Sequence, residues 1–165
     1  IIEFSQKTFG DNVLLDYSNF NVFINKEKVI QKGFELNKVK QQLKEFLMSQ
    51  HFISNVFTEE EIQNSNSNNH MLQIIANGYD PKQNGELVLL FKPGFMEYSS
   101  TGTTHGSPYS YDTHVPCLFY GWKIKKGESF NKKTITQIAP TLAQKLKITM
   151  PNGTQSQVLE EVLNK

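Results

Sequence analysis

The sequence predicts an α/β fold in which helices flank a mixed sheet, and three observations support this prediction. Strand-like and helix-like patterns alternate along the chain. The continuous apolar run Leu87–Phe91 is typical of a strand that is covered on both faces. A length of 165 residues suffices for one domain with a buried core, so we expect a single domain over residues 1–165.

Two patterns predict the first elements. Apolar and polar side chains alternate over residues 12–25 around a turn at Ser18 and Asn19, which predicts a β-hairpin or two short strands. Asn37 has the character of an N-cap, and the apolar side chains that follow it at helical spacing predict an amphipathic helix to about Gln50.

A strand, a capped helix and a polar loop come next. Residues 51–57 predict a short strand, and Thr58 and Glu61 have the spacing of a capping box. The polar run 64–69 predicts a solvated connector, with a ligand-binding loop as the alternative. Residues 71–75 predict one or two helical turns.

The second half of the chain combines two predicted strands with a long loop. Leu87–Phe91 is one strand, and the apolar run 115–120 predicts another that is buried. Between them, residues 98–112 are rich in Gly, Ser, Thr and Tyr, and loops of this length are often functional. A helix that starts near Thr136 and a shorter one over residues 156–163 follow.

The charge balance excludes some classes of function. Seventeen basic residues against sixteen acidic ones leave a net charge of +1, which gives no long-range attraction for nucleic acid or anionic lipid. No apolar run approaches the roughly 18 residues that a membrane helix needs, so we expect no membrane insertion. All the basic residues are lysines, so a phosphate ester would have to be held by a metal, by backbone amides or by arginines outside this chain.

Several familiar site chemistries are absent from the sequence. Cys117 is the single cysteine, which excludes an internal disulfide, and we expect it to be a buried apolar side chain rather than a nucleophile. No phosphate-binding Gly-x-x-x-x-Gly-Lys-Ser/Thr loop, His-Glu-x-x-His or Gly-x-Ser-x-Gly motif occurs. A self-contained site for two metal ions needs several carboxylates and histidines, and the chain has too few in any suitable pattern.

His105 is the main candidate for a metal-binding or catalytic side chain. Gly102 and Gly106 lie on either side of it, and glycine permits strained backbone and leaves room for a bulky group. Its loop runs between two predicted strands, where an α/β scaffold displays ligand-binding residues. A plain loop histidine is the alternative, and for His51 and His70 we expect ordinary packed or surface side chains.

Asp112 and His114 lie close enough in sequence to form a pair that would orient an imidazole toward a metal. The alternative, which we favour, is that residues 111–114 lead into a strand while Asp112 accepts hydrogen bonds from nearby backbone amides. No pattern identifies substrate-binding residues.

Residues 102–121, which read GTTHGSPYSYDTHVP and then CLFYG, resemble the last metal-ligand motif of the type I phosphodiesterase/nucleotide pyrophosphatase family in the alkaline phosphatase superfamily. Within that family they are most similar to bacterial alkaline phosphatases with a threonine nucleophile. Residues 77–86 resemble the segment before that motif, and residues 138–151 resemble the closing helix of the superfamily. We therefore divide the chain into residues 1–74, a strand and helix subdomain without motifs, and residues 75–165, with the last metal-ligand motif and the closing helices.

The resemblance implies the C-terminal portion of an alkaline-phosphatase-like three-layer sandwich. It also implies that His105 is one ligand of a site for two zinc ions. In that family a metal-activated threonine attacks phosphorus, and a metal-bound hydroxide then cleaves the phospho-enzyme. The threonine and the other ligands lie upstream in the family order, and Thr103 and Thr104 fall in the wrong motif to replace the nucleophile.

The implied function is that of a C-terminal part of a zinc-dependent phosphomonoesterase for small phosphate esters, periplasmic or secreted. The chain begins at Ile1 without an initiator Met or a signal peptide, so we expect a fragment whose partner is the missing N-terminal part. Alone, it is expected to hold no stoichiometric zinc and to be inactive. A nucleotide pyrophosphatase or phosphodiesterase of the same superfamily, and a non-catalytic binding module that keeps the fold, are the alternatives.

Overall fold

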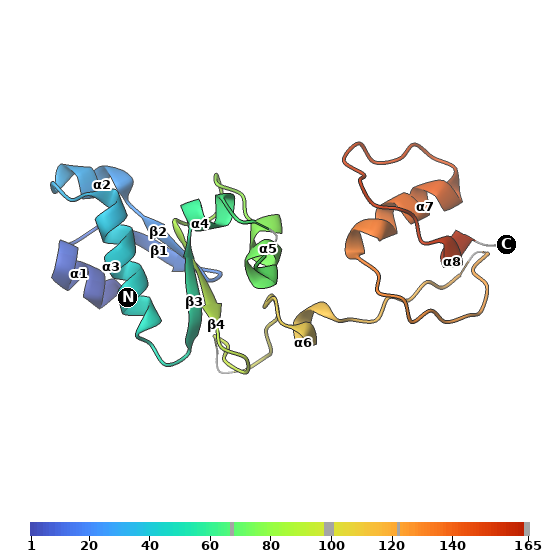
Figure 1. Cartoon of the computed structure of the whole chain (residues 1–165), viewed down its shortest axis with the longest axis horizontal. Coiled ribbons are helices and arrows are strands. Elements are labelled where there is room, and N and C mark those ends of the chain that lie inside the picture. Colours follow the sequence, from blue (N-terminus) through green and yellow to red (C-terminus); the bar gives the residue numbers. More distant parts are fainter. Residues whose placement is uncertain (67, 98–100, 122, 164–165) are drawn as a thin grey trace. The chain divides into compact units, whose positions relative to one another are not determined.

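The computed structural model describes residues 1–66, 68–97, 101–121 and 123–163 of the chain (Figure 1). The chain divides into two compact units, Ile1–Val115 and Pro116–Lys165. From the sequence we place an internal boundary after residue 74, whereas the compact units divide after Val115, at the start of the apolar run 115–120. The candidate histidine loop therefore belongs to the first unit.

A four-stranded sheet forms the centre of the first unit, in the order β1–β2–β4–β3. Its strands are β1 (Leu14–Ser18), β2 (Asn21–Ile24), β3 (Ile53–Thr58) and β4 (Leu87–Phe91). The predicted α/β class with flanking helices is confirmed, and so is the hairpin, which turns at Asn19 and Phe20 with positive φ. The described strand pairs are all antiparallel where we expected a mixed sheet, because β4 enters between β2 and β3 and runs opposite to both.

Helices cover both faces of this sheet. They are α1 (Ile2–Phe9), α2 (Lys26–Gln31), α3 (Leu36–Met48), α4 (Glu59–Gln63) and α5 (His70–Asn77), and a short α6 (Ser110–Thr113) follows later in the chain. Thr58 and Glu61 form the predicted capping box at α4. The predicted start of α3 is wrong by two positions, because the cap position is Glu35 and not Asn37, and Glu35 makes no side-chain cap bond.

Three helices, α1, α2 and the short α6, have no counterpart among the predicted elements. The signal for α2 is present in the sequence, because the Asn25 side chain caps it and accepts a hydrogen bond from the Lys28 backbone N–H at 2.9 Å. α1 has no side-chain cap bond. It is held by packing, because Phe4 stacks on Phe46 of α3 with ring centroids 4.1 Å apart.

Strand β4 contributes to two separate apolar cores. Leu87 and Leu89 lie in the larger core with side chains from α1, α2 and α3, whereas Val88 and Leu90 lie in a smaller core with Ile62 of α4. Successive side chains of a strand point to opposite faces, so an all-apolar strand needs cover on both sides. This confirms the double coverage that the run Leu87–Phe91 predicts, and Figure 1 shows α3 and α5 on opposite sides of the sheet.

A buried lysine joins α3 to α4. Lys40 is only 3% exposed, and its ammonium group forms ion pairs with the carboxylates of Glu59 and Glu60. Burial tends to lower the pKa of Lys40, but hydrogen bonds and charge from the two carboxylates outweigh it and raise that pKa. The same contact lowers the pKa of Glu60.

The second unit contains little regular structure in its described part. It has a 3₁₀ turn, η1 (Ile135–Gln137), then α7 (Ile138–Leu146) and α8 (Glu160–Leu163). Pro140 lies in the first turn of α7, where a missing backbone N–H costs least. The Thr141 hydroxyl donates to the Gln137 carbonyl at 2.6 Å and accepts from the Leu159 backbone N–H at 2.8 Å, which holds the C-terminal segment on α7.

The predicted buried strand over residues 115–120 is not formed. No strand is assigned there, Leu118 is 89% exposed, Tyr120 is 96% exposed, and the Cys117 thiol is exposed rather than buried. The physical reason is that a strand needs a neighbouring strand for its backbone groups, and none of the four described strands pairs with this segment.

No helix in the described part of the chain is both long and apolar enough to cross a membrane.

Candidate functional site

His105 lies in an exposed loop that follows β4, and glycines with unusual backbone angles flank it. Gly102 has φ of +109° and Gly106 has φ of +108°, a region that side chains with a Cβ atom rarely adopt. Residues 98–100 of the predicted long loop lie outside the described residues. The backbone angles of the two glycines determine the path of the loop, and His105 is exposed between them.

Asp112 closes the far side of this loop. Its Oδ2 accepts a hydrogen bond from the Ser107 backbone N–H at 2.9 Å and another from the Ser107 hydroxyl. These two bonds are the main cause that lowers the pKa of Asp112, and attraction to His105 lowers it further. Asp112 therefore stays ionised, and it fixes the backbone two residues beyond His105.

Tyr109 anchors the same loop to the sheet. Its hydroxyl donates a hydrogen bond to the carbonyl of Phe91, the last residue of β4, at 2.7 Å. Its ring packs against the smaller apolar core and stacks on Tyr111 with centroids 5.6 Å apart. The loop is thus held by one tether to a buried strand and by one internal carboxylate.

A cavity of about 140 Å³ lies beside the histidine. Its floor is apolar and comes from the end of β4 with Phe95 and Met96, while its polar rim includes Thr104, His105 and Asp112. An apolar hollow with a few convergent polar groups is the usual form of a small-molecule site. His105 and Asp112, both singled out from the sequence, line this cavity together.

The other sequence candidates lie elsewhere. His114 is exposed just after α6, where its backbone N–H donates to the Ser110 carbonyl at 2.8 Å, and it does not line the cavity. His51 packs edge-on against Phe95 with centroids 5.7 Å apart, and His70 is exposed at the start of α5. Asp112 bonds to Ser107, and its role toward a metal stays a prediction, as does that of His114.

Ser107 and Tyr109 are the site residues that sequence reasoning missed. A signal for Tyr109 exists, because it is a large aromatic residue that directly follows Pro108 in an otherwise small and polar loop. Its partner is a backbone carbonyl, however, and a backbone group leaves no trace in sequence patterns.

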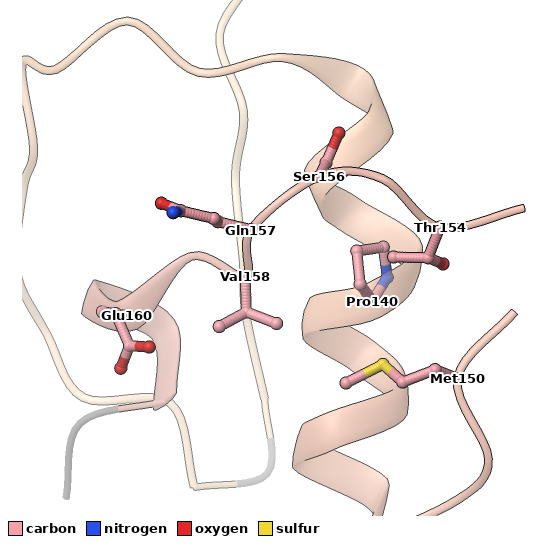
Figure 2. A pocket seen from close by; sticks show the side chains of 7 residues that line it. All are labelled: Pro140, Met150, Thr154, Ser156, Gln157, Val158 and Glu160. Carbon is pink, nitrogen blue, oxygen red and sulfur yellow. The ribbon is translucent and has the colours of Figure 1, made fainter.

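A second hollow of about 480 Å³ lies wholly in the second unit (Figure 2). Figure 2 shows Pro140 and Met150 on one side of it and Gln157, Val158 and Glu160 on the other. Glu160 is the single titratable side chain in its lining. This hollow therefore offers less for catalysis or metal binding than the cavity beside His105.

The described residues do not form a complete metal site. No group of three or more His, Cys, Asp or Glu side chains in the described ranges could hold a metal ion. Zinc sites in proteins use three or four protein ligands, so His105 can supply at most one of them. A metal at this loop would need more ligands than the described residues bring together there.

Comparison with known proteins gives consistent matches over nearly the whole chain. No family model matches it. The chain is 33% identical over 161 residues to "Alkaline phosphatase PafA" of Elizabethkingia meningoseptica, which covers 97% of this chain and 30% of that protein. It is 33% identical over 148 residues to a "Calcium-transporting ATPase" of Myroides odoratus, covering 88% of this chain and 27% of that protein. It is 26% identical over 145 residues to "Alkaline phosphatase PhoV" of Synechococcus elongatus, covering 88% and 26%.

The fold comparison agrees with the sequence comparison. The crystal structure of wild-type alkaline phosphatase PafA matches with a TM-score of 0.88 and 32% identity, over 99% of this chain and 32% of that one. The chain therefore spans about 30% of the length of the first relative that it matches.

Proposed function

Because the chain belongs with the alkaline-phosphatase-like proteins and corresponds to their C-terminal part, we propose that its parent polypeptide is a zinc-dependent hydrolase of small phosphate esters to which His105 contributes one metal ligand. The observation that carries this proposal is the placement of His105. Its imidazole is exposed, on a loop tied to the end of a buried strand, at the rim of a cavity.

The residues of this chain position the ligand and do not complete the site. Zinc can polarise a phosphoryl oxygen and activate water at neutral pH. The described residues of this loop offer one imidazole where such an ion would need several donors, so we expect the chain on its own to carry no step of the reaction. Asp112 and Tyr109 are proposed to hold the loop so that His105 meets an ion whose other ligands lie in the rest of the polypeptide.

The test is substitution of His105 in the full-length protein. His105→Ala is expected to lose about one zinc ion per protein and to lower kcat/KM for an aryl phosphate monoester on the order of 100-fold or more, since one ligand is removed. His70→Ala is the matched control, because His70 is exposed on another element, and it is expected to leave both quantities unchanged. A His105→Ala protein that keeps its zinc and its activity would sink the proposal.

The same assay decides between the related functions. Preference for the monoester over the corresponding diester supports a phosphomonoesterase, whereas the reverse preference identifies a phosphodiesterase or nucleotide pyrophosphatase. Absence of turnover of either ester by metal-loaded full-length protein would overturn the enzymatic proposal in favour of a non-catalytic module.

For the 165-residue chain alone, we expect neither turnover nor stoichiometric zinc in elemental analysis, because one imidazole binds zinc weakly. We also propose a periplasmic or secreted location for the parent protein. Its support is the resemblance of residues 102–121, and cell fractionation of the full-length protein tests it.

A further inference from the structure

Aromatic rings line the cavity beside the histidine loop and hold one another in place. Phe20 and Phe91, both in the lining, meet edge-on with ring centroids 5.2 Å apart. Phe95 is a third aromatic residue of the lining, and the ring of His51 packs edge-on against it at 5.7 Å. Phe52 connects the two groups, because it meets Phe91 at 5.6 Å and His51 at 5.3 Å. Another aromatic ring can pack edge-on or offset against rings arranged in this way.

A tight turn places Phe95 in the wall of the cavity. The Phe95 backbone N–H donates to the Lys92 carbonyl at 3.1 Å. Pro93 and Gly94 occupy the two central positions, and Gly94 has φ of +82°, which is the usual sequence and geometry of a type II turn. The Lys92 backbone N–H donates to the Phe52 carbonyl at 2.9 Å, which fixes the turn to the residue that precedes β3.

A second contact holds the segment that follows this turn. The hydroxyl of Tyr17 on β1 donates a hydrogen bond to the carboxylate of Glu97. Phe95 and Met96, which both line the cavity, therefore lie between two points that are fixed to the sheet. A wall that is ordered in advance loses little conformational freedom when a ligand binds, which favours affinity.

The volume of the cavity fits one ring. Apolar cavities of about 150 Å³ bind a benzene molecule, and this cavity measures about 140 Å³. Pockets for larger organic ligands typically measure about 300 to 1,000 Å³. A two-ring system or a nucleoside is therefore too large to enter it fully.

The charge of the lining disfavours a phosphate group inside the cavity. Asp112 lines the cavity, and hydrogen bonds from Ser107 keep its pKa below the ordinary value, so its carboxylate is ionised at neutral pH. This carboxylate repels a phosphate dianion, and no lysine among the described residues lines the cavity to offset the repulsion. An uncharged apolar group is therefore the better occupant.

We propose that this cavity binds the organic group of the phosphate ester, that it prefers a single aromatic ring, and that Phe95 is the side chain that sets this preference. The inference rests on the proposed function, because it places the phosphate outside the cavity, at a metal ion that His105 on the rim helps to hold. The substrate class is then a monoester of a single-ring aromatic alcohol rather than a nucleotide.

Binding of the organic group alone tests the cavity without zinc or turnover. Full-length protein freed of metal by a chelator is titrated with phenol, and binding is followed by ligand-observed NMR. Phe95→Ala is expected to raise the dissociation constant for phenol about tenfold, because it removes a ring that packs on the ligand. Phe34→Ala is the matched control, since Phe34 is 38% exposed, against 45% for Phe95, and does not line the cavity. Equal dissociation constants in Phe95→Ala and the unmodified protein would overturn the inference.

Turnover by the metal-loaded full-length protein gives the second measurement. Phe95→Ala is expected to lower the ratio of kcat/KM for phenyl phosphate to kcat/KM for methyl phosphate about tenfold. It is also expected to raise the ratio for naphthyl over phenyl phosphate at least about threefold, because the cavity becomes larger. A general loss of stability lowers all three rates together and changes neither ratio. Phe34→Ala is expected to change neither ratio, and unchanged ratios in Phe95→Ala would overturn the inference.

The two measurements separate this inference from the proposed function. If His105→Ala abolishes turnover while Phe95→Ala changes neither phenol binding nor the two ratios, only the inference about the cavity is wrong. If phenol binds as expected but the unmodified protein hydrolyses no ester, the proposed function is wrong, and the assignment of the substrate falls with it. Should Phe95→Ala fail to fold, Phe95→Leu decides in its place, because leucine keeps an apolar side chain and removes the ring.

Discussion

The hydroxyl of Tyr109 donates a hydrogen bond to the backbone carbonyl of Phe91 across 2.7 Å, which joins the loop of His105 to the last residue of β4. A backbone carbonyl at the end of a buried strand is one of the most fixed acceptors that a protein offers. The sheet therefore fixes the position of the loop through Tyr109, and His105 needs no direct contact with the sheet.

Loss of this tether has a measurable cost. Tyr109→Phe keeps the ring packing but leaves the Phe91 carbonyl without its partner, so we expect the free energy of unfolding to fall by about 1 kcal/mol. Urea denaturation of the 165-residue chain measures it. Tyr111→Phe is the control, because that ring is 58% exposed, and equal effects of the two substitutions would contradict the tether.

Asp112 is expected to make the stability of the loop depend on pH. Because hydrogen bonds from Ser107 lower its pKa below the ordinary value of 3.8, its contribution to stability is full above that value and is lost as the pH falls through the lowered pKa. Asp112→Asn is expected to lower Tm at neutral pH, and the difference from the unmodified chain is expected to shrink below about pH 4.

Thermal melts of both proteins between neutral and acidic pH test this prediction. Ser107→Ala removes the hydroxyl donor while the backbone donor stays, so its effect is expected to be smaller and to fade over the same pH range. A difference between Asp112→Asn and the unmodified chain that does not change with pH would show that the carboxylate's charge has no part in it.

Because Lys40 forms its ion pairs in a buried place, we expect the stability cost of replacing a lysine of α3 to depend strongly on its position. Lys40→Met leaves the carboxylate of Glu60 without its lysine partner and leaves Glu59 only its longer ion pair with Lys26, and we expect a loss of about 2 to 3 kcal/mol, moderated because Glu60 is half exposed. Lys38→Met on the same helix removes an exposed pair with Glu35, so it is expected to cost less than about 0.5 kcal/mol. Chemical denaturation of the three chains would refute the prediction if both variants lost the same stability.

Gly85 is required where the chain enters β4. A Cβ atom at this position would lie 2.3 Å from the Val22 carbonyl oxygen of β2, closer than any real contact. Gly85→Ala is therefore expected to push β2 from β4 and to cost about 3 kcal/mol or more. Gly78→Ala, whose Cβ would meet its nearest atom at 3.8 Å, is expected to cost less than about 1 kcal/mol, and circular dichroism melts compare the two.

Local chemistry explains most of what the sequence predicts correctly. The capping box of Thr58 and Glu61 depends on residues three positions apart, and the all-apolar run of β4 depends on burial of both faces. Both features appear in the sequence as short runs of neighbouring residues, so they can be found without the structure. α1 depends instead on distant packing of Phe4 on Phe46, which no local pattern records.

The residues of the candidate site also divide into those that the sequence reveals and those that only the structure reveals. His105 stands out because glycines flank it, and Asp112 because it is a carboxylate nearby, so both can be found in the sequence. The Tyr109 tether depends on the backbone carbonyl of Phe91, which no sequence pattern records. The prediction of a buried strand over residues 115–120 was wrong, because an apolar run favours a strand only where a neighbouring strand pairs with it, and none of the four described strands does so.

The hydrogen bond from Tyr109 to Phe91 and the hydrogen bonds from Ser107 to Asp112 also affect the order in which parts of the chain fold during synthesis. Both close short stretches of chain, of 18 and 5 residues, and short loops cost little entropy and form quickly. The histidine loop can thus fold soon after β4 leaves the ribosome, before the segment with the exposed side chains of Leu118, Tyr120 and Phe130 is complete. That interval is when a nascent chain aggregates most readily, so yield rather than activity is expected to suffer first when the late segment is altered.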